Sequence, residues 1–113
     1  MDERRQEPIR FNINLKAEVL KLNDDSFPVE VRDISRRGLR LICDKFDYDI
    51  NSRINMRIEE PNTDSFISLA AKVIWKRNIE GKSEAGVKLI NILPESHASL
   101  LDYAYSKWIN SRT

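Results

Sequence analysis

The sequence predicts an all-β domain, either a closed antiparallel barrel or a sandwich, with an α-helix at its C-terminal end. Apolar and polar residues alternate through about the first ninety residues, which is the pattern of half-buried strands. Turn-forming residues interrupt this alternation about every ten residues and divide it into six segments. Apolar residues near the C-terminus recur at three- and four-residue spacing, which is the period of an amphipathic helix.

The first three strand segments precede residue 44. Segment 11–22 alternates along its length, and the turn-forming sequence "NDDS" follows it at 23–26. Segment 27–35 resumes the alternation, and segment 39–43 continues it beyond a short charged motif. Five apolar residues line one side of the first segment: Phe11, Ile13, Leu15, Ala17 and Val19.

The other three segments follow a gap of several residues. Segment 52–60 ends at the turn-forming sequence "PNTD" at 61–64. Segment 66–77 is the longest, and the turn "EGK" at 80–82 separates it from segment 85–92. The alternation of the longest segment places five residues on one side: Ile67, Leu69, Ala71, Val73 and Trp75.

The C-terminal helix is expected at about residues 94–110. Pro94 suits the first turn of a helix, and Glu95 suits its positive N-terminal end. The apolar stripe of this helix consists of Leu100, Leu101, Ala104, Tyr105 and Trp108. We expect the stripe to lie across the barrel or over one of its open ends. Residues 1–10 form a charged arm that precedes a single domain of residues 11–113.

Composition argues against several classes of function. A net charge of +1 does not fit a generally basic nucleic-acid or membrane binder. A membrane span needs an apolar run of about 18 residues, and the sequence has none of nearly that length. It also lacks the apolar core of an N-terminal signal peptide, so we expect a cytoplasmic protein. His97 and Cys43, the one histidine and the one cysteine, do not make a zinc ligand set. Without a nucleophile-elbow serine or a glycine-rich phosphate loop, we expect no enzymatic activity, metal or cofactor.

Arginines gather in two parts of the sequence. The motif "VRDISRRGLRL" at 31–41 contains Arg32, Arg36, Arg37 and Arg40, and the arm contains Arg4, Arg5 and Arg10. Arginine presents a planar fork of donors that matches phosphate oxygens and the O6/N7 edge of guanine. The two groups are therefore suited to close around an anionic ligand that carries guanine. Within the motif, Arg36 and Arg37 are candidates for phosphate contacts, and Arg32 and Arg40 are interpreted as solvated strand positions.

Three smaller residues of the same motif complete this candidate site. Asp33 is suited to accept hydrogen bonds from guanine N1–H and N2–H₂, and Ser35 is suited to donate to a base or phosphate oxygen. Gly38 would allow a positive φ or a close approach of the ligand to the backbone. The alternative interpretation is a tight turn with an Asx-type cap and solvated arginines.

The motif also carries a resemblance to a known family. "D-I-S-R-R-G", residues 33–38, fits the D/N-x-S-x-x-G signature of PilZ domains, the bacterial receptors for cyclic di-GMP. The stretch "KVIWKR...GKSEAGVKLINI" resembles the penultimate hairpin of the family, and the resemblance covers nearly the whole chain. It implies a six-stranded antiparallel β-barrel of the split-barrel type with a C-terminal helix.

The resemblance also implies a ligand site. PilZ domains hold cyclic di-GMP between an R-x-x-x-R motif on the N-terminal arm and the D/N-x-S-x-x-G motif. The implied ligand-binding residues here are Arg5, Arg10, Asp33, Ser35 and Gly38, with Arg4, Gln6, Arg36 and Arg37 as additional candidates. Arg5 and Arg10 are five residues apart where the family has four, so that Gln6 takes the first arginine position when Arg10 takes the second.

The expected function is that of a second-messenger receptor that signals when the arm closes onto the barrel. The resemblance implies a protein partner in the control of motility, adhesion or exopolysaccharide, and no DNA, RNA or membrane partner. The alternative is a degenerate PilZ-like adaptor that binds no nucleotide and acts through protein–protein contacts. A small barrel that binds RNA or single strands is a third possibility, which the near-neutral charge disfavours.

Overall fold

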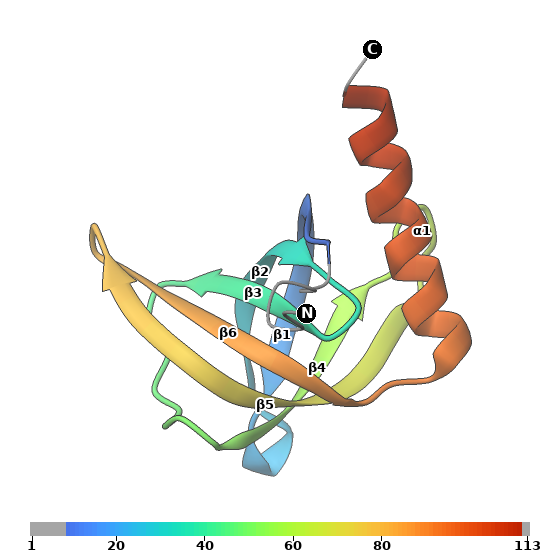
Figure 1. The fold of residues 1–113 in the computed structure, drawn as a ribbon. Helices are drawn as coiled ribbons and strands as arrows, with labels where there is room; N and C mark the ends of the chain where they lie inside the picture. The colour runs from blue at the N-terminus through green and yellow to red at the C-terminus, as the bar shows by residue number, and fades with distance from the viewer. Residues whose placement is uncertain (1–8, 112–113) are drawn as a thin grey trace, which may run out of the picture.

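A computed structural model describes residues 9–111 as a closed barrel of six antiparallel strands with a C-terminal helix (Figure 1). The strands are β1 (Phe11–Leu20), β2 (Ser26–Ile34), β3 (Gly38–Cys43), β4 (Arg53–Glu59), β5 (Phe66–Ile79) and β6 (Lys82–Asn91), and the helix is α1 (Pro94–Ser111). Around the barrel the order is β1-β2-β3-β6-β5-β4. The predicted fold is confirmed, and the choice between barrel and sandwich is settled in favour of the barrel.

The predicted turns are present, and their backbone angles explain their residue types. Between β1 and β2, a short 3₁₀ turn (Leu22–Asp24) places Asn23 and Asp24 at φ 68° and 62°. Between β5 and β6, Glu80 and Gly81 have φ values of 50° and 82°. Positive φ at both central residues is the signature of the two-residue type I′ hairpin, whose twist matches that of the flanking strands.

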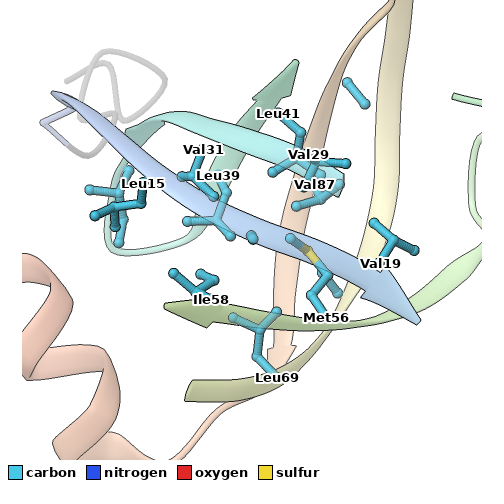
Figure 2. Close-up of a cluster of buried hydrophobic side chains, with 14 of the residues drawn as sticks. Leu15, Val19, Val29, Val31, Leu39, Leu41, Met56, Ile58, Leu69 and Val87 are labelled. Carbon is cyan, nitrogen blue, oxygen red and sulfur yellow. The ribbon is translucent and has the colours of Figure 1, made fainter. Parts of the chain in front are cut away.

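The interior of the barrel is filled by the inward-facing residues of all six strands, several of which Figure 2 shows meeting between the ribbons. Val19, Val31, Leu41 and Met56 are fully buried there. Leu100 of α1 belongs to the same core. Removal of this apolar surface from water is the main source of the stability of the fold.

A β-bulge in β2 turns Asp33 toward the outside of the barrel. Val29 and Val31 face the core, so strict alternation would point residue 33 inward as well. The register of β2 with β3 shifts between Val31 and Asp33, and Ile34 becomes the next core residue. Bulges commonly re-aim a side chain in this way. Asp33 thus lies on the outer face, opposite Arg40 of β3.

A second bulge does the same for Trp75 in β5. The register with β6 shifts between Val73 and Trp75, so that Val73 pairs with Val87 and Trp75 pairs with Gly86. The prediction that Trp75 shares the core-facing side of Val73 is therefore wrong. The indole lies against Gly86 instead, and a Cβ at Gly86 would overlap the indole nitrogen. Glycine at this position gives the ring its place on the outer face.

The helix lies where it was predicted, but only part of its stripe is buried. Leu100 and Ala104 reach the core, and the helix packs mainly on β1. Tyr105 is 51% exposed and Trp108 is 39% exposed, and both rings pack against Phe11. In Figure 1 the C-terminal end of α1 extends beyond the barrel. Within residues 9–111 the structure contains no helix with the length and apolar content needed to span a membrane.

Cys43 and His97, the one cysteine and the one histidine of the sequence, are both at least partly buried. Cys43 is buried in the core, and burial raises the pKa of its thiol. His97 is half-buried rather than fully solvated, and its Nε2 is buried without a hydrogen-bond partner among the described residues.

The docking of α1 predicts a large difference between two leucine substitutions. Leu100 is 1% exposed and Leu22 is 87% exposed. Leu100→Ala should lower the free energy of unfolding by about 2–5 kcal/mol, because it leaves a cavity between α1 and the barrel. Leu22→Ala should change it by less than about 0.5 kcal/mol. Urea denaturation of both variants checks this, and similar midpoints for the two would contradict the packing of α1 described above.

Candidate functional site

The Asp33 carboxylate lies between two arginines from different parts of the chain. Arg10, just before β1, donates from Nη1 to Asp33 Oδ1 at 3.4 Å. Arg40 of β3 donates from Nε to Asp33 Oδ2 at 2.7 Å. The Asp33 side chain is only 9% exposed, compared with 55% for Arg10 and 26% for Arg40. A carboxylate this buried needs such partners, since an unpaired charge away from water is costly.

The charges continue in alternation across the next two strands. Arg40 also donates to Glu84 Oε2 of β6 at 2.9 Å, and Arg77 of β5 donates to Glu84 Oε1 at 2.7 Å. The strand order β2-β3-β6-β5 places the strands of Asp33, Arg40, Glu84 and Arg77 side by side in that order. We call the chain of contacts Arg10–Asp33–Arg40–Glu84–Arg77 the ion-pair row.

The contacts of the ion-pair row shift the pKa values of Arg40 and Glu84. The hydrogen bond to Asp33, followed by the nearby charges of Asp33 and Glu84, raises the pKa of Arg40. The hydrogen bond from Arg77 is the largest influence on Glu84, and together with the charge of Arg40 it lowers the pKa of Glu84. Both groups therefore stay charged at neutral pH, which keeps the row intact.

The turn between β2 and β3 is held by Ser35. Its Oγ accepts hydrogen bonds from the backbone N–H groups of Arg37 and Gly38, at 3.3 and 3.2 Å. Its own N–H donates to the Gly38 carbonyl at 2.9 Å. The capped turn of the alternative interpretation is thus present, but the cap is Ser35 rather than Asp33. The cap fixes the backbone from which Arg36 and Arg37 extend.

Gly38 has a structural reason that the sequence interpretation did not include. Its φ is not positive, which rules out that part of the interpretation. A Cβ at this position would overlap the carbonyl oxygen of Val87 in β6. The backbone N–H of Leu89 also donates to the Arg37 carbonyl at 2.8 Å. Glycine is therefore required for β3 and its turn to approach β6 closely.

A pocket of about 610 Å³ lies beside this turn, within the range of about 300–1,000 Å³ that is usual for ligand sites. Its lining includes the polar residues Arg10, Ser35, Arg36, Arg37 and Lys88 and the aromatic residue Trp75. We call it the arm pocket. Asp33 does not line it but contacts Arg10, which does.

A second hollow of about 670 Å³ lies on the outer face beside the hairpin of β5 and β6. Its charged residues include two ion pairs, Lys82 with Asp44 at 2.6 Å and Arg32 with Glu30 at 2.8 Å. Because these exposed charges already satisfy one another, they offer less to an anionic ligand than the arm pocket. We therefore place the candidate site in the arm pocket.

The structure brings together most of the predicted site residues. Arg10, Ser35, Gly38, Arg36 and Arg37 all line the arm pocket, with Asp33 next to it. Three predicted residues, Arg4, Arg5 and Gln6, lie outside the described residues.

Sequence reasoning missed the part of the site that comes from other strands. Arg40 is not the solvated residue that was expected, because it bridges Asp33 and Glu84. Glu84, Arg77 and Trp75 carried no signal of a role in the site. Alternating charges on strands normally indicate a solvated face, and their pairing here depends on which strands are neighbours.

The chain matches a known protein family. A family model described as the PilZ domain matches residues 3–106. The chain belongs to the PilZ domain family. A search of curated proteins finds no match.

Solved PilZ structures share the fold at low sequence identity. The Bacillus subtilis inhibitor of motility MotI (DgrA) superposes with a TM-score of 0.78 at 17% identity, over 94% of this chain and 52% of that one. The PilZ domain of Escherichia coli YcgR, solved with c-di-GMP, has a TM-score of 0.74 at 13% identity, over 96% and 95% of the two chains. The K. pneumoniae MrkH–c-di-GMP complex has a TM-score of 0.75 at 11% identity, over 96% and 53%. The chain thus spans about half the length of MotI and MrkH. PilZ domains are regulatory receptors rather than enzymes.

The lowered pKa of Glu84 predicts how the ion-pair row responds to acid. A glutamate whose pKa is depressed by folding stabilises the protein above its unfolded pKa of about 4.3 and loses that contribution as the pH falls through the lower folded value. Wild type should therefore be more stable than Glu84→Gln at pH 7, and the difference should shrink below about pH 4.3. Thermal unfolding of both proteins from pH 7 to pH 3 checks this.

Glu18 and Asp44, whose pKa values are also lowered, are present in both proteins and cancel in the difference. A difference in stability that stays constant down to pH 3 would show that the charge of Glu84 has no part in it.

Proposed function

We propose that this chain is a non-enzymatic receptor that binds cyclic di-GMP in the arm pocket. The observation that carries the proposal is the contact between Arg10 and Asp33, at 3.4 Å. These residues are 23 positions apart, one at the base of the arm and the other in the D-x-S-x-x-G motif. Their contact supports the proposal, because it joins the base of the arm to the motif that the proposed site would use.

The chemistry of the arm pocket suits a cyclic dinucleotide that carries two phosphates and two guanines. The guanidinium groups of Arg10, Arg36 and Arg37 offer planar donor forks for phosphate oxygens or for a guanine edge. Asp33 lies next to the pocket, in contact with Arg10, and there it offers carboxylate oxygens to the guanine N1–H and N2–H₂ groups. The indole of Trp75, over which the Arg77 guanidinium lies at 5.3 Å, adds an aromatic part to the lining.

The arm is proposed to close over the bound nucleotide. In this proposal residues 1–10 act as the arm and residues 11–113 as the domain that receives it. Arg5 and Arg4 add phosphate contacts, and Gln6 takes the first position of the arginine motif. A glutamine there forgoes one charge-assisted contact, which is typically worth about 1.5–3 kcal/mol. We therefore expect a lower affinity than a complete R-x-x-x-R motif would give.

Arm closure changes the surface that the barrel offers to a protein partner. We propose that this partner belongs to a bacterial pathway controlled by cyclic di-GMP in the cytoplasm, such as motility, adhesion or exopolysaccharide synthesis. One structural neighbour, MotI, is described as an inhibitor of motility.

Titration calorimetry with cyclic di-GMP tests the receptor proposal. Wild type should bind with micromolar or better affinity, and Arg10→Ala and Asp33→Ala should each weaken binding by about tenfold to over a hundredfold. Arg32→Ala is the matched control, because Arg32 lies on the same strand as Asp33 but pairs with Glu30. Its affinity should equal that of wild type. The absence of any heat of binding to wild type at high nucleotide concentration would refute the proposal.

A second candidate function is that of an adaptor that binds no nucleotide. The observation in its favour is the exposed apolar surface of α1, where Tyr105 is 51% exposed and Ile109 is 39% exposed. An adaptor of this kind should capture its protein partner equally well with and without cyclic di-GMP, and Ile109→Glu should abolish capture. Capture that depends on the nucleotide would favour the receptor instead.

A further inference from the structure

We propose that Arg40 and Glu84 are positioning residues that hold the Asp33 carboxylate in the orientation that cyclic di-GMP requires. The inference rests on the proposed function, because it concerns how the same site recognises its ligand. Neither residue lines the arm pocket, and both lie outside the D-x-S-x-x-G motif, because Arg40 is two residues beyond its glycine on β3 and Glu84 is on β6.

The two arginines that contact Asp33 hold its carboxylate unequally. The Arg40 side chain, which is 26% exposed, donates to Oδ2 at 2.7 Å, whereas the Arg10 side chain, which is 55% exposed, reaches Oδ1 at 3.4 Å. The short contact fixes the carboxylate, and the long one leaves Oδ1 only weakly engaged on the side of the arm. Each carboxylate oxygen accepts more than one hydrogen bond. Oδ1 is therefore the oxygen that accepts from guanine.

The Arg40 side chain is in turn held by Glu84. An arginine side chain has several rotatable bonds, and fixing them costs conformational entropy. Glu84 accepts from Nη1 of Arg40 at 2.9 Å, while the Nε of the same guanidinium contacts Asp33. Two carboxylates at different edges of one planar group leave it a single orientation. Arg77 completes the arrangement by donating to the other oxygen of Glu84 at 2.7 Å.

The bridge that Arg40 makes between Asp33 and Glu84 requires a guanidinium group. Lysine has the same charge but presents it as a single ammonium group, which does not reproduce the planar fork. Arg40→Lys should therefore keep the charge of the ion-pair row and lose the orientation of Asp33. The effect should appear in nucleotide affinity.

The test is a double-mutant cycle measured by titration calorimetry with cyclic di-GMP. The four proteins are wild type, Glu84→Gln, Asp33→Asn and the double variant, each studied well below its melting temperature. If Glu84 acts through Asp33, Glu84→Gln should weaken binding by about tenfold in the wild-type background and have no further effect in Asp33→Asn. Arg40→Lys should weaken binding by a similar factor.

Glu30→Gln is the matched control, since Glu30 is also a strand glutamate paired with an arginine, at 2.8 Å, but outside the arm pocket. It should leave the affinity unchanged. The inference is overturned, and the receptor proposal stands, if wild type binds and Glu84→Gln binds as tightly as Glu30→Gln. It is also overturned if Glu84→Gln weakens binding equally with and without Asp33. If wild type does not bind, the receptor proposal fails and takes the inference with it.

Discussion

The site depends on one buried carboxylate. The residue Asp33 as a whole is 6% exposed. It lies on the outer face of the barrel, where one carboxylate oxygen contacts Arg10 and the other contacts Arg40. A carboxylate in this position requires cationic partners, because an unpaired buried charge strongly destabilises the folded state. The position of Arg10, the orientation of Arg40 and the pairing of Glu84 all follow from this requirement.

The barrel supplies these partners through its topology. β6 lies between β3 and β5, so a hairpin late in the sequence brings Glu84 and Arg77 next to the motif between β2 and β3. Two bulges then direct Asp33 and Trp75 to the same outer face. Two glycines allow the close contacts, since Gly38 lies against the Val87 carbonyl and Gly86 lies under the Trp75 ring.

Most of the fold was predictable because its signals are local. Alternation identified the strands, the change of period identified α1, and the D-I-S-R-R-G motif identified the family. The error at Trp75 arose because a bulge shifted the alternation by one residue, which reversed the side on which the ring lies. The roles of Arg40 and Glu84 could not be predicted, because their pairing depends on strands that are neighbours in space and far apart in sequence.

The central claim is that the arginines of the arm pocket bind the nucleotide. The most direct measurement is an NMR titration with cyclic di-GMP that follows the arginine Nε–H resonances. The account predicts that the resonances of Arg10, Arg36 and Arg37, which line the arm pocket, shift on binding. The resonance of Arg53, at the start of β4, should remain in place. Shifts at Arg53 without shifts at the three pocket arginines, or no shifts at all, would contradict it.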